Sequence, residues 1–418
     1  MLKKLLLLTF IFTVELFSQN KIFIYMDLKQ TDHLRAYGIT FNALRKGLKA
    51  DWLLNYRGGS FMIDYNDQVA NDCRVEGVAF DVISTSQAAE IYSSVQRDDN
   101  NMDVERLEKA PKIAVYVPPN FNPWDDAVTL ALDYAKVPYD KIWNDEVLHG
   151  DLSKYDWLHL HHEDFTGQYG KFFASFSNAQ WYIDAQMTYE KDAKKNGYKK
   201  VSQMMLDVAE DIKKFVGGGG FLFAMCSATD SYDIALAAHN TDICAPMYDG
   251  DAADPDAQKN LDFANSLAFT NFKLEMNPYI YEYSSIDVQP AEIGSQENDY
   301  FTLFEFSAKY DLVPTMLTQD HVNVIKGFMG QTTMFHKDQI KPTVIILAER
   351  PGTDQVKYIT GNYGRGTFTF YGGHDPEDYQ HAVGDPPTEL SLYKNSPGYR
   401  LILNNILFPA ATKKKQKT

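Results

Sequence analysis

The sequence predicts an α/β protein built on a doubly wound, mostly parallel sheet, because strand-like and helix-like segments alternate along much of its length. Residues 112–117 have the apolar character of a buried strand, residues 201–216 form a helical pattern with one apolar face, and residues 221–225 are a second apolar strand. Glycines at 217–220 separate that helix from its strand, as expected where a helix ends and the chain turns.

The N-terminal part is expected to be a smaller βα region. Its predicted strand, helix and second strand cover residues 21–26, 33–48 and 52–56. The same order recurs from residue 112, and Trp143 follows Lys112 at the interval that separates Trp52 from Lys21. This spacing fits two related units or a chance likeness between ordinary βα units.

The C-terminal part returns to the sheet pattern after a long irregular stretch. Strands are expected at 343–347, 356–360 and 367–371, with a glycine turn before the last one that predicts a hairpin. The 418 residues suit two or three domains of about 150 residues each. The expected segments are a signal peptide at 1–18, an N-terminal βα region at 19–95, a linker at 96–110, the larger domain at 111–241 and 342–409, an insertion at 242–341, and a basic tail at 410–418.

The N-terminus has the layout of a signal peptide. Lys3 and Lys4 precede an apolar run at 5–14, which is far shorter than the roughly 20 residues of a membrane span. Cleavage is expected near Ser18 or Gln19. The rest of the sequence has no long apolar run, so we expect a periplasmic or extracellular protein with no membrane span after signal cleavage.

Charge and cysteine content exclude other classes. The formal net charge of −16 argues against nucleic acid as a partner, because binding to phosphates requires clustered Lys and Arg. The chain has three cysteines, Cys73, Cys226 and Cys244. An odd count in a chain of this length is no disulfide framework, so at least one thiol is expected to be free.

Cys226 is the strongest candidate nucleophile. It follows the strand at 221–225 directly, and the small residues Ala224 and Ala228 stand two positions away on either side. This is the pattern of a nucleophile elbow, a sharp strand-to-helix turn at which bulky neighbours would collide. The amides at the start of the following helix would lower the pKa of the thiol and stabilise an oxyanion. The alternative is a small apolar cysteine buried at the end of a strand.

His374 is the candidate base. It follows the last predicted strand after two glycines, and parallel strands gather residues of this kind at their carboxyl ends. His374 would accept the thiol proton, while Glu377 or Asp375 would orient its ring. The alternative is a loop histidine hydrogen-bonded to its neighbours.

The strand at 112–117, the Cys226 elbow and the Gly373-His374 segment together resemble a class I glutamine amidotransferase-like domain. The resemblance covers about 112–240 and 342–409. It implies a flavodoxin-like sheet and a Cys-His-Glu triad that hydrolyses an amide, with Cys226 as nucleophile, His374 as base and Glu377 as orienter. Asp375 lengthens the usual His-Pro-Glu spacing of the family.

The whole chain, including residues 56–60 and 158–164, also resembles an exported bacterial family labelled asparagine synthetase B. A glutamine-hydrolysing synthetase of that name needs a cysteine after the initiator methionine, where this chain has Leu2. It also needs a Ser-Gly-Gly-x-Asp-Ser loop for ATP, which this sequence lacks. The resemblance therefore implies hydrolysis rather than ATP-dependent synthesis.

A second cluster of polar residues follows the predicted strand at 157–161. His159 and His161 face one way and His162 the other, and we expect His161, His162, Glu163 and Ser227 to contact the substrate. The favoured reaction needs no cofactor. One alternative is zinc held by His159, His161 and a third ligand, Glu163 or His374, with one open position for water. The other is a polar strand edge that lines the same cleft.

Two further patterns suggest binding. The acidic residues at 249–256 suit either a calcium site or a solvated loop, although their spacing differs from the twelve-residue calcium loop. Aromatic residues that suit stacking on sugars or peptides, or else a place in the core, are Trp124, Tyr169, Trp181 and Tyr182.

The favoured function is an exported Cys226–His374 amide hydrolase that acts on a small amide or an amidated cell-surface component. One alternative is a non-catalytic protein that binds a carbohydrate or peptide on the same fold. This alternative predicts a buried Cys226 with His374 out of reach. The other alternative is a metal-assisted hydrolase, which predicts stoichiometric zinc.

Overall fold

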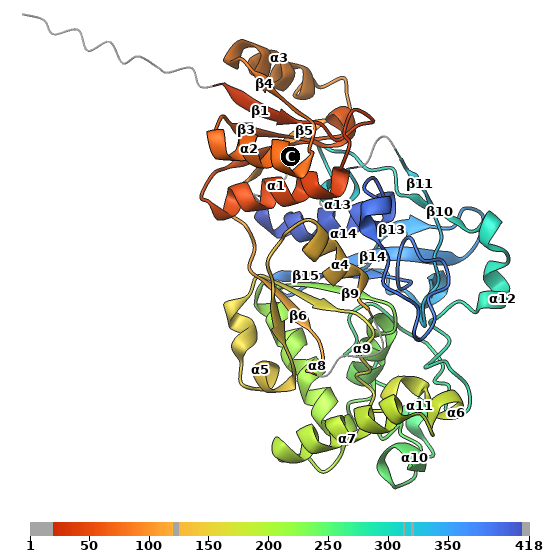
Figure 1. Cartoon of the computed structure of the whole chain (residues 1–418). Coiled ribbons are helices and arrows are strands. Elements are labelled where there is room, and N and C mark those ends of the chain that lie inside the picture. Colours follow the sequence, from red (N-terminus) through yellow and green to blue (C-terminus); the bar gives the residue numbers. More distant parts are fainter. Residues whose placement is uncertain (1–19, 120–124, 312–313, 319–321, 412–418) are drawn as a thin grey trace, which may run out of the picture.

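The structure is a computed structural model that describes residues 20–119, 125–311, 314–318 and 322–411. The expected signal peptide at 1–18 and residues 412–418 of the expected basic tail lie outside these residues. Two sheets organise the chain, one in the N-terminal region and a larger one in the remainder (Figure 1). The fold is therefore mixed α/β, as predicted.

The N-terminal sheet has five antiparallel strands in the order β4-β1-β3-β2-β5. Their bounds are β1 Lys21–Ile24, β2 Ala50–Leu54, β3 Ser60–Asp64, β4 Phe80–Ile83 and β5 Asp103–Leu107. The helices of this region are α1 His33–Arg45, α2 Asp67–Glu76 and α3 Thr85–Val95. Since β3 lies between β1 and β2, the first four strands form a split βαβ arrangement.

The larger sheet has ten strands, with β12 paired to β14 beside the path β11-β10-β13-β14-β15-β9-β8-β6-β7. The strands from β15 to β7 are parallel, and the others are antiparallel. Their bounds are β6 Ile113–Tyr116, β7 Asp140–Ile142, β8 Trp157–Leu160, β9 Phe221–Met225, β10 Tyr300–Leu303, β11 Val324–Lys326, β12 Phe335–His336, β13 Ile345–Glu349, β14 Gln355–Tyr363 and β15 Gly366–Tyr371.

Helices cover both faces of the parallel half. On one face α4 and α14 pack against Val115, Phe223 and Tyr371, and on the other α8 and α9 pack against Leu158 and other strand residues. The remaining helices are α4 Ala127–Tyr134, α5 Asn144–Leu148, α6 Phe173–Phe176, α7 Gln180–Lys195, α8 Val201–Gly218, α9 Ala228–Ala237, α10 Pro246–Asp249, α11 Ala257–Asn260, α12 Pro290–Ile293, α13 Pro314–Leu317 and α14 Pro397–Leu407. Short 3-10 helices are η1 Tyr56–Gly58, η2 Asp151–Lys154, η3 Tyr169–Lys171, η4 Gln296–Asn298, η5 Lys337–Gln339, η6 Leu390–Leu392 and η7 Phe408–Ala410.

Helix α14 lies between the two sheets and joins them (Figure 1). Arg400 on this helix is fully buried, and its guanidinium donates to the hydroxyl of Tyr37 at 2.9 Å and to the carbonyl oxygen of Thr318 at 3.2 Å. It also donates to the carbonyl oxygens of Met26 and Gly58 in the N-terminal region. The N-terminal region and the larger sheet therefore share one core.

The structure corrects three features of the expected organisation. The expected linker at 96–110 contains β5, which pairs with β2. The expected insertion at 242–341 supplies β10, β11 and β12 to the large sheet. Together with β13 and β14 they make half of that sheet antiparallel, whereas a mostly parallel sheet was expected. The two βα units also differ, since β6 pairs directly with β7 whereas β3 separates β1 from β2.

The long helices of the described part of the chain are amphipathic or too short to cross a bilayer, and none qualifies as a membrane span.

Candidate active site

The candidate site lies at the carboxyl ends of three neighbouring parallel strands. Strands β8, β9 and β15 are paired side by side, and their last residues are nearly level with one another. The residues that follow these strands therefore meet at one edge of the sheet. They are His161 and His162 after β8, Cys226 after β9 and His374 after β15.

Cys226 occupies a sharp turn between β9 and α9. Its φ of +50° is a left-handed conformation, which residues other than glycine rarely adopt, so the turn holds the backbone under strain. The amide of Cys226 donates to the carbonyl oxygen of Gly373 at 3.2 Å. Ala224 and Ala228 on either side are buried, and the cysteine itself is only 3% exposed. This is the local geometry of a nucleophile elbow.

A loop from the region once expected as an insertion covers the thiol. We call residues 328–334 the capping loop. The backbone amide of Gln331 donates to Sγ of Cys226 at 3.3 Å. Glycines permit this close packing: a Cβ on Gly372 would lie 2.4 Å from the carbonyl oxygen of Thr333, and one on Gly330 would lie 2.7 Å from the amide nitrogen of His374.

His374 is buried beside the thiol of Cys226, and the two groups affect each other's pKa. Burial alone would lower the pKa of His374, but Asp125 and Cys226 favour the cation and raise it to about 10. Burial likewise opposes ionisation of Cys226, yet the hydrogen bond with His374 brings the pKa of the thiol below its ordinary value. Both shifts favour the charged forms, a thiolate on Cys226 and an imidazolium on His374.

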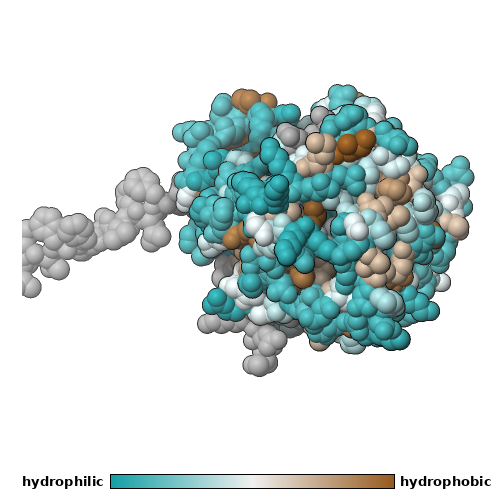
Figure 2. Space-filling view, turned by 90° about the horizontal axis from the view of Figure 1, so that it is seen from below, coloured by the Kyte–Doolittle hydropathy of each residue, from teal (hydrophilic) through white to brown (hydrophobic). Residues whose placement is uncertain are grey.

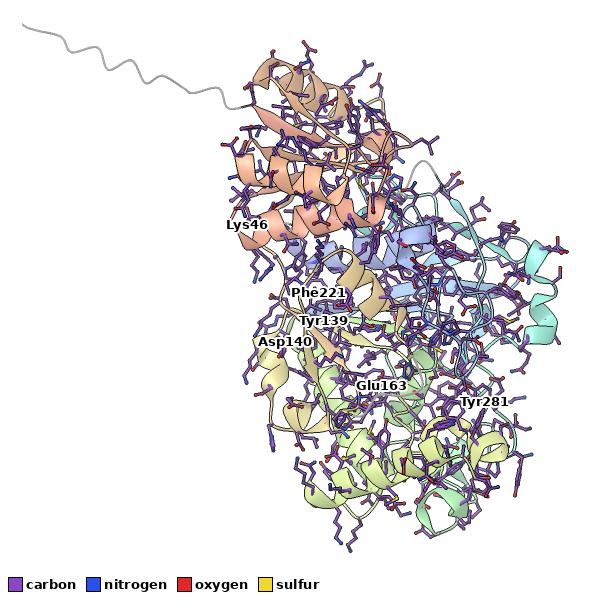
Figure 3. All side chains as sticks on the ribbon, viewed as in Figure 1. Lys46, Tyr139, Asp140, Glu163, Phe221 and Tyr281 are labelled. Atoms are coloured by element: carbon purple, nitrogen blue, oxygen red, sulfur yellow. The ribbon has the colours of Figure 1, made fainter. Side chains whose placement is uncertain are left out.

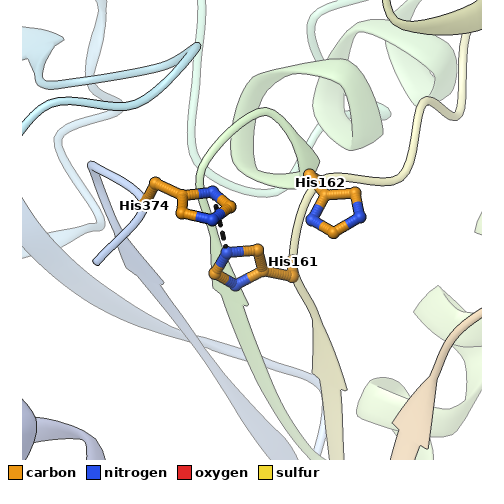
Figure 4. A group of neighbouring side chains, drawn as sticks. All are labelled: His161, His162 and His374. Carbon is orange, nitrogen blue, oxygen red and sulfur yellow. Dashed lines mark hydrogen bonds between the residues drawn. The ribbon is translucent and has the colours of Figure 1, made fainter. Parts of the chain in front are cut away.

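His161 contacts the other side of the His374 ring. Its Nε2 lies 3.1 Å from Nδ1 of His374, and the two rings are nearly perpendicular (Figure 4). Burial lowers the pKa of His161 well below its ordinary value, so its ring is neutral. A protonated His374 therefore donates from Nδ1 to the lone pair of His161, whose own Nδ1–H points towards a carboxylate of Asp126, 3.6 Å away.

Asp126 and His159 lie behind His161. Asp126 accepts the amides of Val128 and Thr129 as the N-cap of α4, and Nε2 of His159 lies 3.1 Å from the same carboxylate. Burial would raise the pKa of Asp126, but His159 and His161 hold it well below its ordinary value. An ionised, helix-anchored carboxylate thus fixes the histidines that contact the candidate base.

Asp125 forms a second carboxylate contact. One of its oxygens lies 3.8 Å from Nε2 of His374 and 2.9 Å from Nε2 of His381. The His374 and His381 rings stack with centroids 4.4 Å apart.

Sequence reasoning missed Asp125, Asp126 and His381. Two consecutive aspartates shortly after the first strand of the parallel sheet were the signal that would have identified the carboxylates.

Glu377, expected to orient His374, points elsewhere. Its backbone amide donates to the side chain of Asp375 at 2.8 Å, and its carboxyl group hydrogen-bonds Ser396. This tight turn directs the Glu377 carboxyl group towards α14. The contacts expected of the orienting residue are made by His161 and Asp125 instead.

The other expected substrate-contacting residues lie around the same centre. Glu163 is buried in the interior (Figure 3), where its carboxylate accepts the amide of His161 at 2.8 Å, and burial raises its pKa to about 8. Ser227 is fully buried at the start of α9, and its hydroxyl has no hydrogen-bond partner within the described residues. His162 is only partly buried, and its ring stacks loosely on His374.

Several combinations of these side chains suit a metal ion. Within the described residues, three overlapping groups have ligand atoms within 4.8 Å of one another. They are His161 with His162 and His374, Asp125 with His374 and His381, and Asp126 with His159 and His161. The expected zinc ligand Glu163 belongs to none of them, because its carboxylate accepts the backbone amide of His161.

The acidic residues once considered for calcium have a different partner. The ammonium group of Lys200 lies 2.6 Å from Asp242, 3.0 Å from Asp249 and 2.5 Å from Asp251. The ammonium group of Lys200 thus bridges three of the carboxylates in this region.

The two other cysteines are buried free thiols. Burial raises the pKa of Cys73 to about 12 and that of Cys244 well above its ordinary value. Of the three thiols, Cys226 is the one whose pKa is lowered.

No family model matches the sequence, and no curated protein matches it significantly. Among solved structures, the chain is similar to the cytoplasmic protein STM3548 from Salmonella typhimurium, with 10% identity over 72% of this chain and 100% of that chain at a TM-score of 0.36. The cytoplasmic protein STM1381 from Salmonella typhimurium LT2 is similar at 11% identity, over 72% of this chain and 100% of that one, with a TM-score of 0.32. A beta-galactosidase from Bacillus circulans sp. alkalophilus matches 65% of this chain and 29% of its own at 13% identity and a TM-score of 0.26.

Proposed function

We propose that the protein is an exported amide hydrolase with Cys226 as nucleophile and His374 as its acid–base partner. The observation that carries this proposal is the position of Cys226, in a strained turn after β9 with the buried His374 following the neighbouring strand β15. The carbohydrate- or peptide-binding alternative expects His374 out of reach of Cys226, so this arrangement favours the hydrolase.

The reaction follows from these groups. The Cys226 thiolate attacks the amide carbon, and a C–S bond forms as the carbonyl oxygen becomes an oxyanion. The amide of Gln331, which faces Sγ, then becomes available to that oxyanion. Protonated His374 gives its proton to the leaving nitrogen as the C–N bond breaks. Water, activated by neutral His374, attacks the thioester and releases the carboxylic acid and the thiolate.

His161 and Asp126 act as positioning residues in this scheme. They hold Nδ1 of His374 in one hydrogen bond and thereby fix the orientation of its ring. Their role replaces the one expected for Glu377.

The proposal extends to fold family and location. We assign the large sheet to the flavodoxin-like, class I glutamine amidotransferase-like type, within the exported family labelled asparagine synthetase B. The elbow after β9, the histidine after the neighbouring β15 and the helices on both faces support this assignment. We propose a periplasmic or extracellular location for this activity, since hydrolysis needs no ATP.

The test is to trap the covalent intermediate. The protein lacking residues 1–18 is incubated with a panel of primary and secondary amides, quenched in acid and analysed by intact-protein mass spectrometry. We expect one acyl adduct on the Cys226 peptide and none in Cys226→Ser protein. Amide hydrolysis that survives in Cys226→Ser would overturn the proposal.

A metal-assisted hydrolase is the second candidate, favoured by the three overlapping histidine and aspartate groups. It predicts about one zinc ion per chain in dialysed protein, with activity lost on chelation and restored by zinc. Elemental analysis beside the adduct experiment separates the two mechanisms, since the thiol mechanism predicts an adduct that chelator leaves unchanged.

A further inference from the structure

A pocket of about 580 Å³ lies beside the candidate site. Helix α7 forms one wall, and the segment at 164–172 forms the other. Its aromatic residues are Tyr169, Phe172, Trp181, Tyr182 and Tyr189. The volume falls within the range of small-molecule binding sites. Trp124, which was expected to contribute aromatic surface, lies outside the described residues.

Three residues connect the lining of the pocket to the candidate site. His162 and Gly170 line it, and the His162 ring stacks on His374 with centroids 6.0 Å apart. The side-chain amide of Gln331 donates to the carbonyl oxygen of Gly170 at 2.7 Å, while the backbone amide of Gln331 donates to Sγ of Cys226. One residue of the capping loop thus separates the pocket from the nucleophile.

The wall opposite α7 is held in a strained conformation. Tyr169, Gly170 and Lys171 all have positive φ, at 51°, 72° and 59°. The carboxylate of Asp164 accepts the amide of Gly170 at 2.9 Å, and the buried ammonium of Lys171 donates to the carbonyl oxygen of Glu275 at 2.7 Å. Strain that the surrounding contacts maintain in this way is concentrated at functional sites.

The walls offer rings and a few polar groups. The backbone of α7 is satisfied within the helix, so an extended peptide would find no backbone partners on that wall. The charged side chains of the lining are of both signs, namely Asp164, Asp184 and Lys191, which gives no strong preference for an anion or a cation. A neutral ligand with flat apolar faces and hydroxyl groups fits this lining best, as a sugar does.

The end of the molecule that carries α7 is mainly hydrophilic, with separate hydrophobic patches rather than one broad apolar area (Figure 2). This surface favours a water-soluble ligand over a lipid.

We propose that this pocket binds the sugar part of a neutral, amide-bearing carbohydrate and directs its amide past His162 to Cys226. Binding of the sugar depends only on the pocket, whereas hydrolysis of the amide by Cys226 rests on the proposed function.

The test uses Cys226→Ala protein, so that binding is measured without turnover. A disaccharide of N-acetylglucosamine is titrated by calorimetry, with cellobiose and choline as comparison ligands. We expect saturable binding of the acetylated disaccharide, weaker binding of cellobiose and none of choline. Trp181→Ala should weaken binding about tenfold through the loss of one stacking ring. Tyr310→Ala, which removes an exposed aromatic residue remote from the pocket, is the matched control and should bind normally.

Failure of this inference differs from failure of the proposed function. No binding of the disaccharide, equal binding in Trp181→Ala, or preference for choline would overturn the sugar pocket even if simple amides are hydrolysed through Cys226. Binding that depends on Trp181, without any acyl adduct in the wild type, would overturn the hydrolase and leave the pocket. Thermal unfolding of each variant shows whether a loss of binding reflects a loss of the fold.

Discussion

The pKa values of Cys226 and His374 are shifted in opposite directions, and both shifts favour the charged form. The pKa of the thiol lies below its ordinary value, and that of His374 is about 10. Each charge stabilises the other in a buried site, where neighbouring charges interact more strongly than in water. The pair is therefore expected to carry a reactive thiolate at neutral pH, which a cysteine buried merely as an apolar side chain would not.

His161→Ala tests the positioning role at the residue scale. Loss of the partner of Nδ1 frees the His374 ring, so we expect kcat to fall roughly a hundredfold while KM changes little. The pH dependence of kcat should also shift, which a purely structural defect would not produce. His239→Ala, on the segment after α9, is the control and should leave both constants unchanged.

The residue that orients the His374 ring could not be predicted from the sequence. Glu377 was chosen because it is close to His374 in sequence. The turn made by Asp375 instead directs Glu377 towards Ser396. The residue that contacts Nδ1 of His374 is His161, which directly follows β8 and is 213 positions away in sequence. The pairing of β8, β9 and β15 brings the two together.

The capping loop is the element that completes the site, and hydrogen bonds to two buried side chains, those of Lys357 and Asp287, hold it. The ammonium of Lys357 donates to the carbonyl oxygens of Phe328 and Thr333 at 2.5 and 2.9 Å, although burial lowers its pKa to about 7. The carboxyl group of Asp287 accepts the amide of Thr333 at 2.8 Å. The loop amides that face Cys226 are thereby fixed.

Lys357→Met is expected to speed the labelling of Cys226 by small reagents and to slow amide hydrolysis. Two carbonyl oxygens lose a donor, which costs about 2 kcal/mol of unfolding free energy. The loosened loop should let small reagents reach Cys226 faster, while hydrolysis slows roughly tenfold because the oxyanion donor is misplaced. Iodoacetamide labelling and turnover are measured together. The exposed Lys326→Met is the control, and a parallel change in both rates would contradict the proposed role of the loop.

Elements with a clear local pattern were predictable from the sequence. The strand at 221–225 has the observed bounds of β9, and the predicted hairpin is β14 and β15. The capping loop and strands β10 to β12 were not predicted. Their segment lacks regular alternation, and their partners are distant in sequence, as Phe301 with Ile325 and Thr302 with Glu349 illustrate.

At the scale of the whole molecule, α14 makes the two sheets one folding unit. Its buried Arg400 donates to Tyr37 of α1 and to the carbonyl oxygen of Met26 after β1 in the N-terminal region, and to the carbonyl oxygen of Thr318 after α13. The sequence predicts a linker at 96–110 and therefore two separate cores. The shared core could not be predicted, because it depends on contacts between residues more than 300 positions apart.

Arg400→Met should therefore destabilise the entire chain. Several buried acceptors lose their donor, so we expect a loss of about 3 kcal/mol or more in one cooperative unfolding transition. Denaturant unfolding is followed by fluorescence and circular dichroism, with the exposed Arg365→Met as control. Separate transitions for the two regions would contradict the shared core.

Acid stability offers a second test at this scale. Burial lowers the pKa of His33 to about 4, so the unfolded chain binds a proton at this side chain between pH 6.5 and 4 while the folded protein does not. Stability should fall across that window by on the order of 3 kcal/mol from this residue. His33→Gln should show a shallower fall in urea titrations at pH 7 and pH 4. An unchanged slope would contradict the buried neutral ring.

The most direct test of the central claim is the pH dependence of Cys226 alkylation. Wild-type and His374→Ala proteins are labelled with iodoacetamide from pH 5 to 9, and labelling of the Cys226 peptide is quantified by mass spectrometry, with the Cys73 peptide as internal reference. An activated thiol predicts an apparent pKa below the ordinary value of about 8.5, returning to or above that value without His374. Identical profiles in the two proteins would contradict the thiolate–imidazolium pair.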